Sequence, residues 1–125
     1  KRTFDFAHAE GLPVIVHSCG YVEPLVPGLI EAGMDCLQAM EVKAGMDLVA
    51  LKKAYGDRIA LCGGLDIRAL ETNDREAIRR ELDAKLPEAM AGGGYILHSD
   101  HSIPDRVEYE SYRYFVDRGL EMGTY

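Results

Sequence analysis

Short apolar runs alternate along this chain with segments in which apolar residues recur at helical spacing. The runs that predict strands cover residues 12–16, 35–40, 58–62 and 95–97. The segments that predict helices cover residues 24–32, 47–55, 73–91 and 108–122, and residues 1–10 resemble the end of a further helix. This alternation predicts an α/β fold with a parallel sheet and right-handed crossovers. The strands are apolar throughout, which indicates a sheet that is buried on both faces.

Capping residues and glycines bound the longest predicted helix. Asn73 or Asp74 is suited to cap its N-terminus, and three consecutive glycines at residues 92–94 end it. Pro87 lies within it, and we expect this proline to distort the helix.

Four strand–helix units fit two architectures, half of a TIM (β/α)8 barrel or a small doubly wound sheet. A full barrel needs about 250 residues, whereas this chain has 125 residues and begins with Lys1. We therefore expect residues 1–125 to be a single domain that belongs to a larger protein. Unpaired strand edges in a half barrel favour association with another copy, so we expect a homo-oligomer. A doubly wound binding domain is the alternative.

Charge and cysteine content narrow the class of partner. The net charge of −7 disfavours nucleic acid and anionic membranes, and no apolar run approaches the roughly 20 residues of a membrane helix. No secretory signal is visible, and an odd, sparse set of three cysteines indicates a reducing compartment. We expect Cys36 and Cys62 to be small buried hydrophobic residues. The sequence thus predicts a cytoplasmic protein that acts on a small molecule.

The clearest chemical signal follows the first predicted strand. His17 and Cys19 stand at its C-terminal tip, where parallel α/β proteins place their chemistry. Side chains two residues apart point to the same side of a strand, and imidazole with thiolate is a ligand set typical of zinc. His101, after the last strand, is the candidate third ligand, with His98 and Asp100 in reserve. The alternative is that His17 and Cys19 only fill the mouth of the sheet.

Two carboxylates follow the middle strands. Glu41 ends the second strand and is a candidate site residue, and the alternative is a salt bridge to Lys43 or exposure to solvent. Asp66 follows two glycines that let the backbone approach a ligand closely. The alternative for Asp66 is a helix cap for residues 67–70.

Five segments, in this order, resemble the C-terminal part of the uroporphyrinogen decarboxylase superfamily. They are residues 13–20 (Pro-Val-Ile-Val-His-Ser-Cys-Gly), 29–35, 41–47, 63–66 and 92–97. The resemblance covers nearly the whole chain. It implies a (β/α)8 barrel of which this chain forms the last four units, the C-terminal half.

The superfamily has two main branches, and the resemblance relates the candidate residues to both. Cofactor-free uroporphyrinogen decarboxylases of haem biosynthesis have a late histidine that falls on His101. Zinc-dependent, cobamide-linked methyltransferases carry His-x-Cys at the strand tip matched by His17 and Cys19, and a further cysteine where this chain has His101. The pair His17 and Cys19 therefore favours the methyltransferase-like branch, and His101 departs from its pattern.

This branch implies an enzyme that transfers a methyl group between a corrinoid, with a corrinoid protein as a possible partner, and a thiol-type acceptor. In this reading His17, Cys19 and His101 hold zinc, and His101, Glu41 and Asp66 act at the mouth of the barrel. The alternative within the family is decarboxylation of a porphyrinogen, with His101 contacting the substrate. A hypothesis of another class is a catalytically inactive half-barrel fragment that self-associates.

Overall fold

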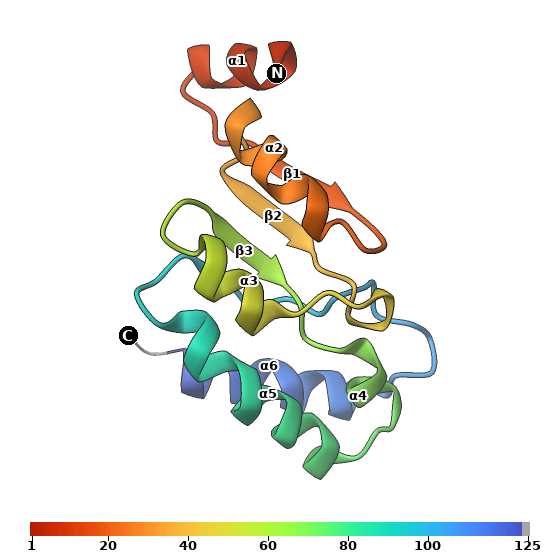
Figure 1. Ribbon diagram of the computed structural model, residues 1–125. Coiled ribbons are helices and arrows are strands. Elements are labelled where there is room, and N and C mark those ends of the chain that lie inside the picture. The colour runs from red at the N-terminus through yellow and green to blue at the C-terminus, as the bar shows by residue number, and fades with distance from the viewer. Residues whose placement is uncertain (124–125) are drawn as a thin grey trace.

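Four parallel strands form one sheet in the computed structural model, which describes residues 1–123 (Figure 1). The strands are β1 (Ile15–Ser18), β2 (Cys36–Ala39), β3 (Ala60–Gly63) and β4 (Tyr95–Ile96), in the spatial order β1-β2-β3-β4. Each strand lies beside its neighbour in sequence, without the reversal of strand order typical of a doubly wound sheet. The fold is therefore α/β and is consistent with a partial (β/α)8 barrel.

Helices connect the strands and pack on one another. They are α1 (Arg2–Ala9), η1 (Glu23–Leu25), α2 (Val26–Ala32), η2 (Val42–Ala44), α3 (Leu48–Tyr55), α4 (Ile67–Glu71), α5 (Arg75–Met90) and α6 (Tyr109–Met122). Figure 1 shows α2 and α3 on the same side of the sheet, with the long helices α5 and α6 side by side. Among residues 1–123, no helix is both long and apolar enough to cross a membrane.

One face of the sheet carries the core. Val16, Leu37, Leu61 and Tyr95 lie in one register row across the four strands, so their side chains share a face. Leu37 and Leu61 are completely buried, and Val16 and Tyr95 pack against the same cluster. This cluster includes buried residues of α3 and α5, so the helices cover this face.

The opposite face is less covered at its edges. Its next register row is His17, Gln38, Cys62 and Ile96, one from each strand. Ile96 on β4 is 48% exposed and Ile15 on β1 is 57% exposed, whereas Cys62 in the middle is buried. The prediction of burial on both faces is therefore wrong for the outer strands, because apolar composition does not reveal which face the helices cover. In a barrel this face points to the interior.

Two helical features differ from the sequence-based expectation. The short helix α4 was not expected as a separate element, although its cap was foreseen as an alternative: the Asp66 carboxylate accepts a hydrogen bond from Arg68 N at 2.9 Å. Pro87 lies inside α5 without ending it. Leu86 and Ala89 flank the proline and are buried, and this packing maintains the helix despite the lost backbone hydrogen bond. Asp74 caps α5, as predicted, by accepting from Glu76 N at 3.0 Å.

The difference between the two faces predicts a difference in stability. Leu37→Ala removes a fully buried side chain and is expected to lower the free energy of unfolding by about 2–5 kcal/mol. Ile15→Ala, on the neighbouring strand, removes a side chain that is 57% exposed and is expected to cost less than about 1 kcal/mol. Urea denaturation monitored by circular dichroism measures both. Equal losses would contradict this assignment and would mean that the Ile15 face is covered in solution.

Candidate functional site

The three predicted zinc ligands line one cavity at the C-terminal edge of the sheet. A cavity of about 200 Å³ lies there, and its lining residues are His17, Cys19, Gln38, Ala39, His98, Asp100, His101 and Ser102. These residues come from β1 and β2 and from the segments that follow β1 and β4. The ends of β1 and β4, at Ser18 and Ile96, are 78 residues apart in sequence, and the segments around them contribute to one cavity, as expected for parallel strands.

His17 and Cys19 form a close pair. His17 belongs to β1, and Cys19 follows immediately after the strand ends at Ser18. The Cys19 Sγ atom lies 3.5 Å from His17 Nε2, and both residues are exposed at the cavity. Gly20 has a φ of +82°, a conformation that glycine adopts without strain, and it turns the chain away directly after Cys19. The local geometry therefore leaves one nitrogen and one sulfur donor together at the strand tip.

Gln38 contacts His17 of this pair, and no sequence pattern marks it as a site residue. Gln38 lies beside His17 in the parallel register, and its Oε1 is 3.2 Å from His17 Nδ1. A carboxamide oxygen only accepts hydrogen bonds, so in the neutral ring this contact places the proton on Nδ1 and leaves the Nε2 lone pair on the side of Cys19. Such a partner on the far nitrogen is what fixes the ring of a metal-binding histidine.

A complete metal site is not formed by the side chains as they stand. Among residues 1–123, no three His, Cys, Asp or Glu side chains are grouped closely enough to hold one ion. His101 lines the cavity, but its Nδ1 lies 3.3 Å from the Ser102 carbonyl oxygen. The donor chemistry of His17 and Cys19 fits zinc, whereas the third ligand is in the same cavity without joining the pair.

Asp100, a reserve ligand in the sequence analysis, instead ties loops together. It is only 2% exposed, and its two carboxyl oxygens accept from Val42 N and Ile67 N, each at 2.8 Å. Its own backbone N–H donates to Leu65 O at 2.7 Å. The segments that follow β2, β3 and β4 therefore converge on one buried carboxyl group. Both oxygens are occupied by protein donors, which argues against Asp100 as a metal ligand.

Glu41 anchors the turn after β1. Its Oε2 accepts from Gly20 N at 2.7 Å, and its Oε1 lies 3.2 Å from Lys43 Nζ, which is the salt bridge considered as the alternative. The Gly20 N–H and the Lys43 ammonium hold the pKa of the Glu41 carboxyl below its ordinary value. Glu41 does not line the cavity of His17 and Cys19. A catalytic role for Glu41 remains a prediction.

Asp66, like Glu41, is held by a backbone N–H group and by a basic side chain. Besides capping α4, it forms a bidentate ion pair with the Arg68 guanidinium, with a shortest distance of 2.6 Å. Burial raises the pKa of the Asp66 carboxyl, but the hydrogen bonds from Arg68 outweigh this effect, so the pKa is lowered. Asp66 also lies outside the lining of the His17 cavity, and its catalytic role remains a prediction.

The other cysteines differ from Cys19. Cys36 and Cys62 are buried, as predicted. Burial, with a contribution from the neighbouring Cys62, raises the pKa of the Cys36 thiol to about 11, and burial also raises the pKa of Cys62. Cys19 is exposed at the cavity, so it is the cysteine of the three that is available for metal binding or chemistry.

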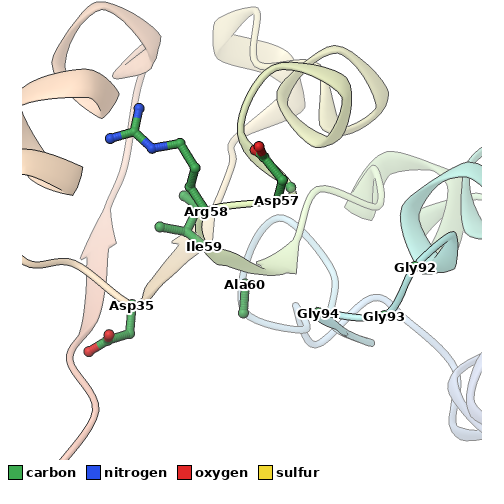
Figure 2. Close-up of a pocket in the computed structure, with 9 residues that line it drawn as sticks. Asp35, Asp57, Arg58, Ile59, Ala60, Gly92, Gly93 and Gly94 are labelled. Carbon is green, nitrogen blue, oxygen red and sulfur yellow. The ribbon is translucent and has the colours of Figure 1, made fainter.

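A depression at the opposite end of the sheet lacks converging chemical groups. It is lined by residues that precede the strands, including Asp35, Arg58 and the glycines 92–94 (Figure 2). In Figure 2 the Arg58 and Asp35 side chains point in different directions. Asp35 is engaged by His8 Nε2 at 2.7 Å and by Val14 N at 2.6 Å. This end of a barrel serves stability rather than chemistry.

Comparison with known proteins identifies one family. The family model described as uroporphyrinogen decarboxylase (URO-D) matches residues 1–121. A search of curated proteins finds no match.

The role of Asp100 is testable against a matched residue in the same loop. Asp100→Asn removes one of two acceptors from buried backbone donors and is expected to lower the free energy of unfolding by about 1–3 kcal/mol. Asp105→Asn changes an exposed side chain in the same way and is expected to have an effect within about 0.5 kcal/mol.

Urea denaturation gives both free energies, and amide hydrogen exchange locates the change. We expect faster exchange at the Val42 and Ile67 amides in the Asp100 variant alone. If the two variants are equally stable, Asp100 does not hold the loops.

Proposed function

The chain belongs to the uroporphyrinogen decarboxylase family, and we propose that the protein of which it forms part transfers a methyl group from a corrinoid to a thiol-type acceptor. Zinc is the proposed cofactor, with His17, Cys19 and His101 as its ligands. The proposed partners are a small-molecule acceptor and a corrinoid protein.

One observation carries this proposal. An imidazole nitrogen and a thiol sulfur lie 3.5 Å apart at the C-terminal edge of a parallel sheet, and His101 lines the same cavity. Nitrogen and sulfur donors are the ligands that zinc prefers, and this edge is where barrel enzymes bind their substrates. A structural cysteine has no need of an imidazole partner or of access to a cavity. Cys36 and Cys62 are buried, and within residues 1–123 neither forms a hydrogen bond with a histidine.

Methyl transfer to a thiol requires that the acceptor sulfur be nucleophilic. Bound zinc lowers the pKa of a coordinated thiol, which makes it nucleophilic at neutral pH. In this proposal the acceptor thiol would release its proton to solvent on binding as a thiolate, and the thiolate would take the methyl group from the corrinoid donor, which would keep the bonding electron pair.

In this proposal, other residues of this chain orient the zinc ligands and the loops around them. Gln38 holds the His17 ring so that Nε2 faces the cavity, and the Asp100 contacts hold the loops around it. Glu41 and Asp66 are the proposed carboxylates of the mouth, where each also fixes a neighbouring loop.

Decarboxylation of a carboxylate-bearing porphyrinogen is the second candidate. The observation that favours it is that His17, Cys19 and His101 are not grouped for metal binding within residues 1–123. In this candidate His101 contacts the substrate and no metal is needed. Metal content therefore separates the two candidates.

The test is metal analysis of untagged protein by mass spectrometry, after loading with zinc and removal of excess. We expect about one zinc per chain, the stoichiometry of a single mononuclear site, and loss of that zinc in His17→Ala and Cys19→Ala. The matched controls are His8→Ala and Cys36→Ala, which remove the same side chains outside the cavity and are expected to retain zinc.

Gln38 gives an independent check of the same proposal. Gln38→Met keeps the side-chain length but removes the acceptor for His17 Nδ1. We expect zinc affinity to fall by about 10- to 100-fold, the usual effect of losing a partner of a metal-binding histidine. Competition with a fluorescent zinc chelator measures this affinity. Absence of zinc from the wild-type protein and from the controls would overturn the methyl-transfer proposal in favour of decarboxylation.

A further inference from the structure

A second cavity adjoins the one that contains His17 and Cys19. Its volume is about 360 Å³, and it shares His101 and Ser102 with the first cavity. The other lining residues are Lys43, Ile67, Arg68, Glu71, Pro104 and Arg106. Three basic side chains thus border a cavity beside the proposed site, in a chain whose net charge is −7.

Each of these basic residues forms an ion pair with an acidic residue, and the two side chains of each pair differ in their exposure to solvent. The basic side chains of Lys43, Arg68 and Arg106 are 59%, 56% and 71% exposed. Their partners Glu41, Asp66 and Glu71 are 12%, 18% and 19% exposed, in the same order. In all three pairs the carboxylate is therefore largely buried and the cation is exposed to solvent.

The other ion pairs within residues 1–123 lack this arrangement. The members of the pair Arg113 and Asp117 are both 59% exposed, and Arg79 is less exposed than its partner Glu76. The inward position of the acids at the cavity has separate causes. Glu41 accepts from Gly20 N and Asp66 caps α4, so both acids are fixed to the backbone.

The cations that line the cavity have more hydrogen-bond donors than their acidic partners use. An ammonium group has three donors and a guanidinium group has five, so a single carboxylate partner leaves some of these donors unused. Because the cations are exposed while the acids are largely buried, an incoming anion can share each cation without displacing its acidic partner. Arg68 and Arg106 both line the cavity, and a guanidinium group can bind a carboxylate or a phosphate through two parallel hydrogen bonds.

We propose that this second cavity binds the anionic group, a carboxylate or a phosphate, of the substrate whose reacting end occupies the His17 cavity. Lys43, Arg68 and Arg106 are its ligand-binding residues, and Glu71 sets the affinity by competing for Arg106. The location of the reacting end rests on the proposed function. The anion site itself does not, because none of its three cations is a proposed zinc ligand.

The test uses inorganic phosphate and succinate as probes, titrated into the ¹⁵N-labelled chain in the presence of a chelator and followed by amide chemical shifts. We expect saturable shifts confined to the segments that line the cavity, near residues 43, 67–71 and 101–106. Arg106→Gln and Lys43→Gln are each expected to weaken binding by about fivefold, the effect of losing one partly exposed charge interaction. Glu71→Gln is expected to strengthen it, because Arg106 loses its competing partner.

Arg113→Gln is the matched control, since it removes the same charge from an exposed pair that does not line the cavity. It is expected to leave the affinity for either anion unchanged.

Tighter binding of phosphate than of succinate assigns a phosphate-bearing substrate, and the reverse assigns a carboxylate-bearing one. Shifts spread over the surface, or an equal loss in Arg113→Gln, would overturn the proposal. His17→Ala is expected to keep anion binding while losing zinc, so failure of one proposal is distinguishable from failure of the other.

Discussion

The mouth of this half barrel depends on one buried carboxyl group. Asp100 follows β4 and accepts backbone hydrogen bonds from Val42, after β2, and from Ile67, after β3. Val42 and Ile67 are the first residues of η2 and α4, so their backbone N–H groups have no acceptor within their own helices. A buried N–H without an acceptor costs about 1–3 kcal/mol. A single acceptor with two oxygens therefore satisfies two loops at once. This arrangement also places His101, the next residue, between the two cavities.

The two faces of the sheet divide stability from chemistry. The row of Leu37 and Leu61 packs under the helices and forms the core, whereas the row of His17 and Gln38 faces the opposite way. Because side chains alternate along a strand, a polar residue in the second row does not disturb the first. β1 can thus contribute Val16 to the core and His17 to the site from adjacent positions.

The strand tips and their meeting point could be predicted from the sequence, because parallel strands end at one edge of a sheet. His17, Cys19 and His101 were assigned to one place on that basis, and they line one cavity. Gln38 could not be predicted, since one glutamine in an apolar run has no recognisable pattern until the register puts it beside His17. The ion pair between Arg106 and Glu71 joins residues that are 35 positions apart. Which of the two is buried depends on tertiary packing and could not be predicted from the sequence. The role of Asp100 in holding other segments could not be predicted either, because its backbone partners Val42 and Ile67 are distant in sequence.

The central claim is that His17 and Cys19 together bind a metal ion at the mouth of the barrel. X-ray absorption spectroscopy of the zinc-loaded chain tests it most directly, because it counts the ligand types around the ion. The account predicts one sulfur ligand at about 2.3 Å, with nitrogen or oxygen ligands at about 2.0–2.2 Å. Zinc bound without sulfur, or with the sulfur signal unchanged in Cys19→Ala, would contradict it.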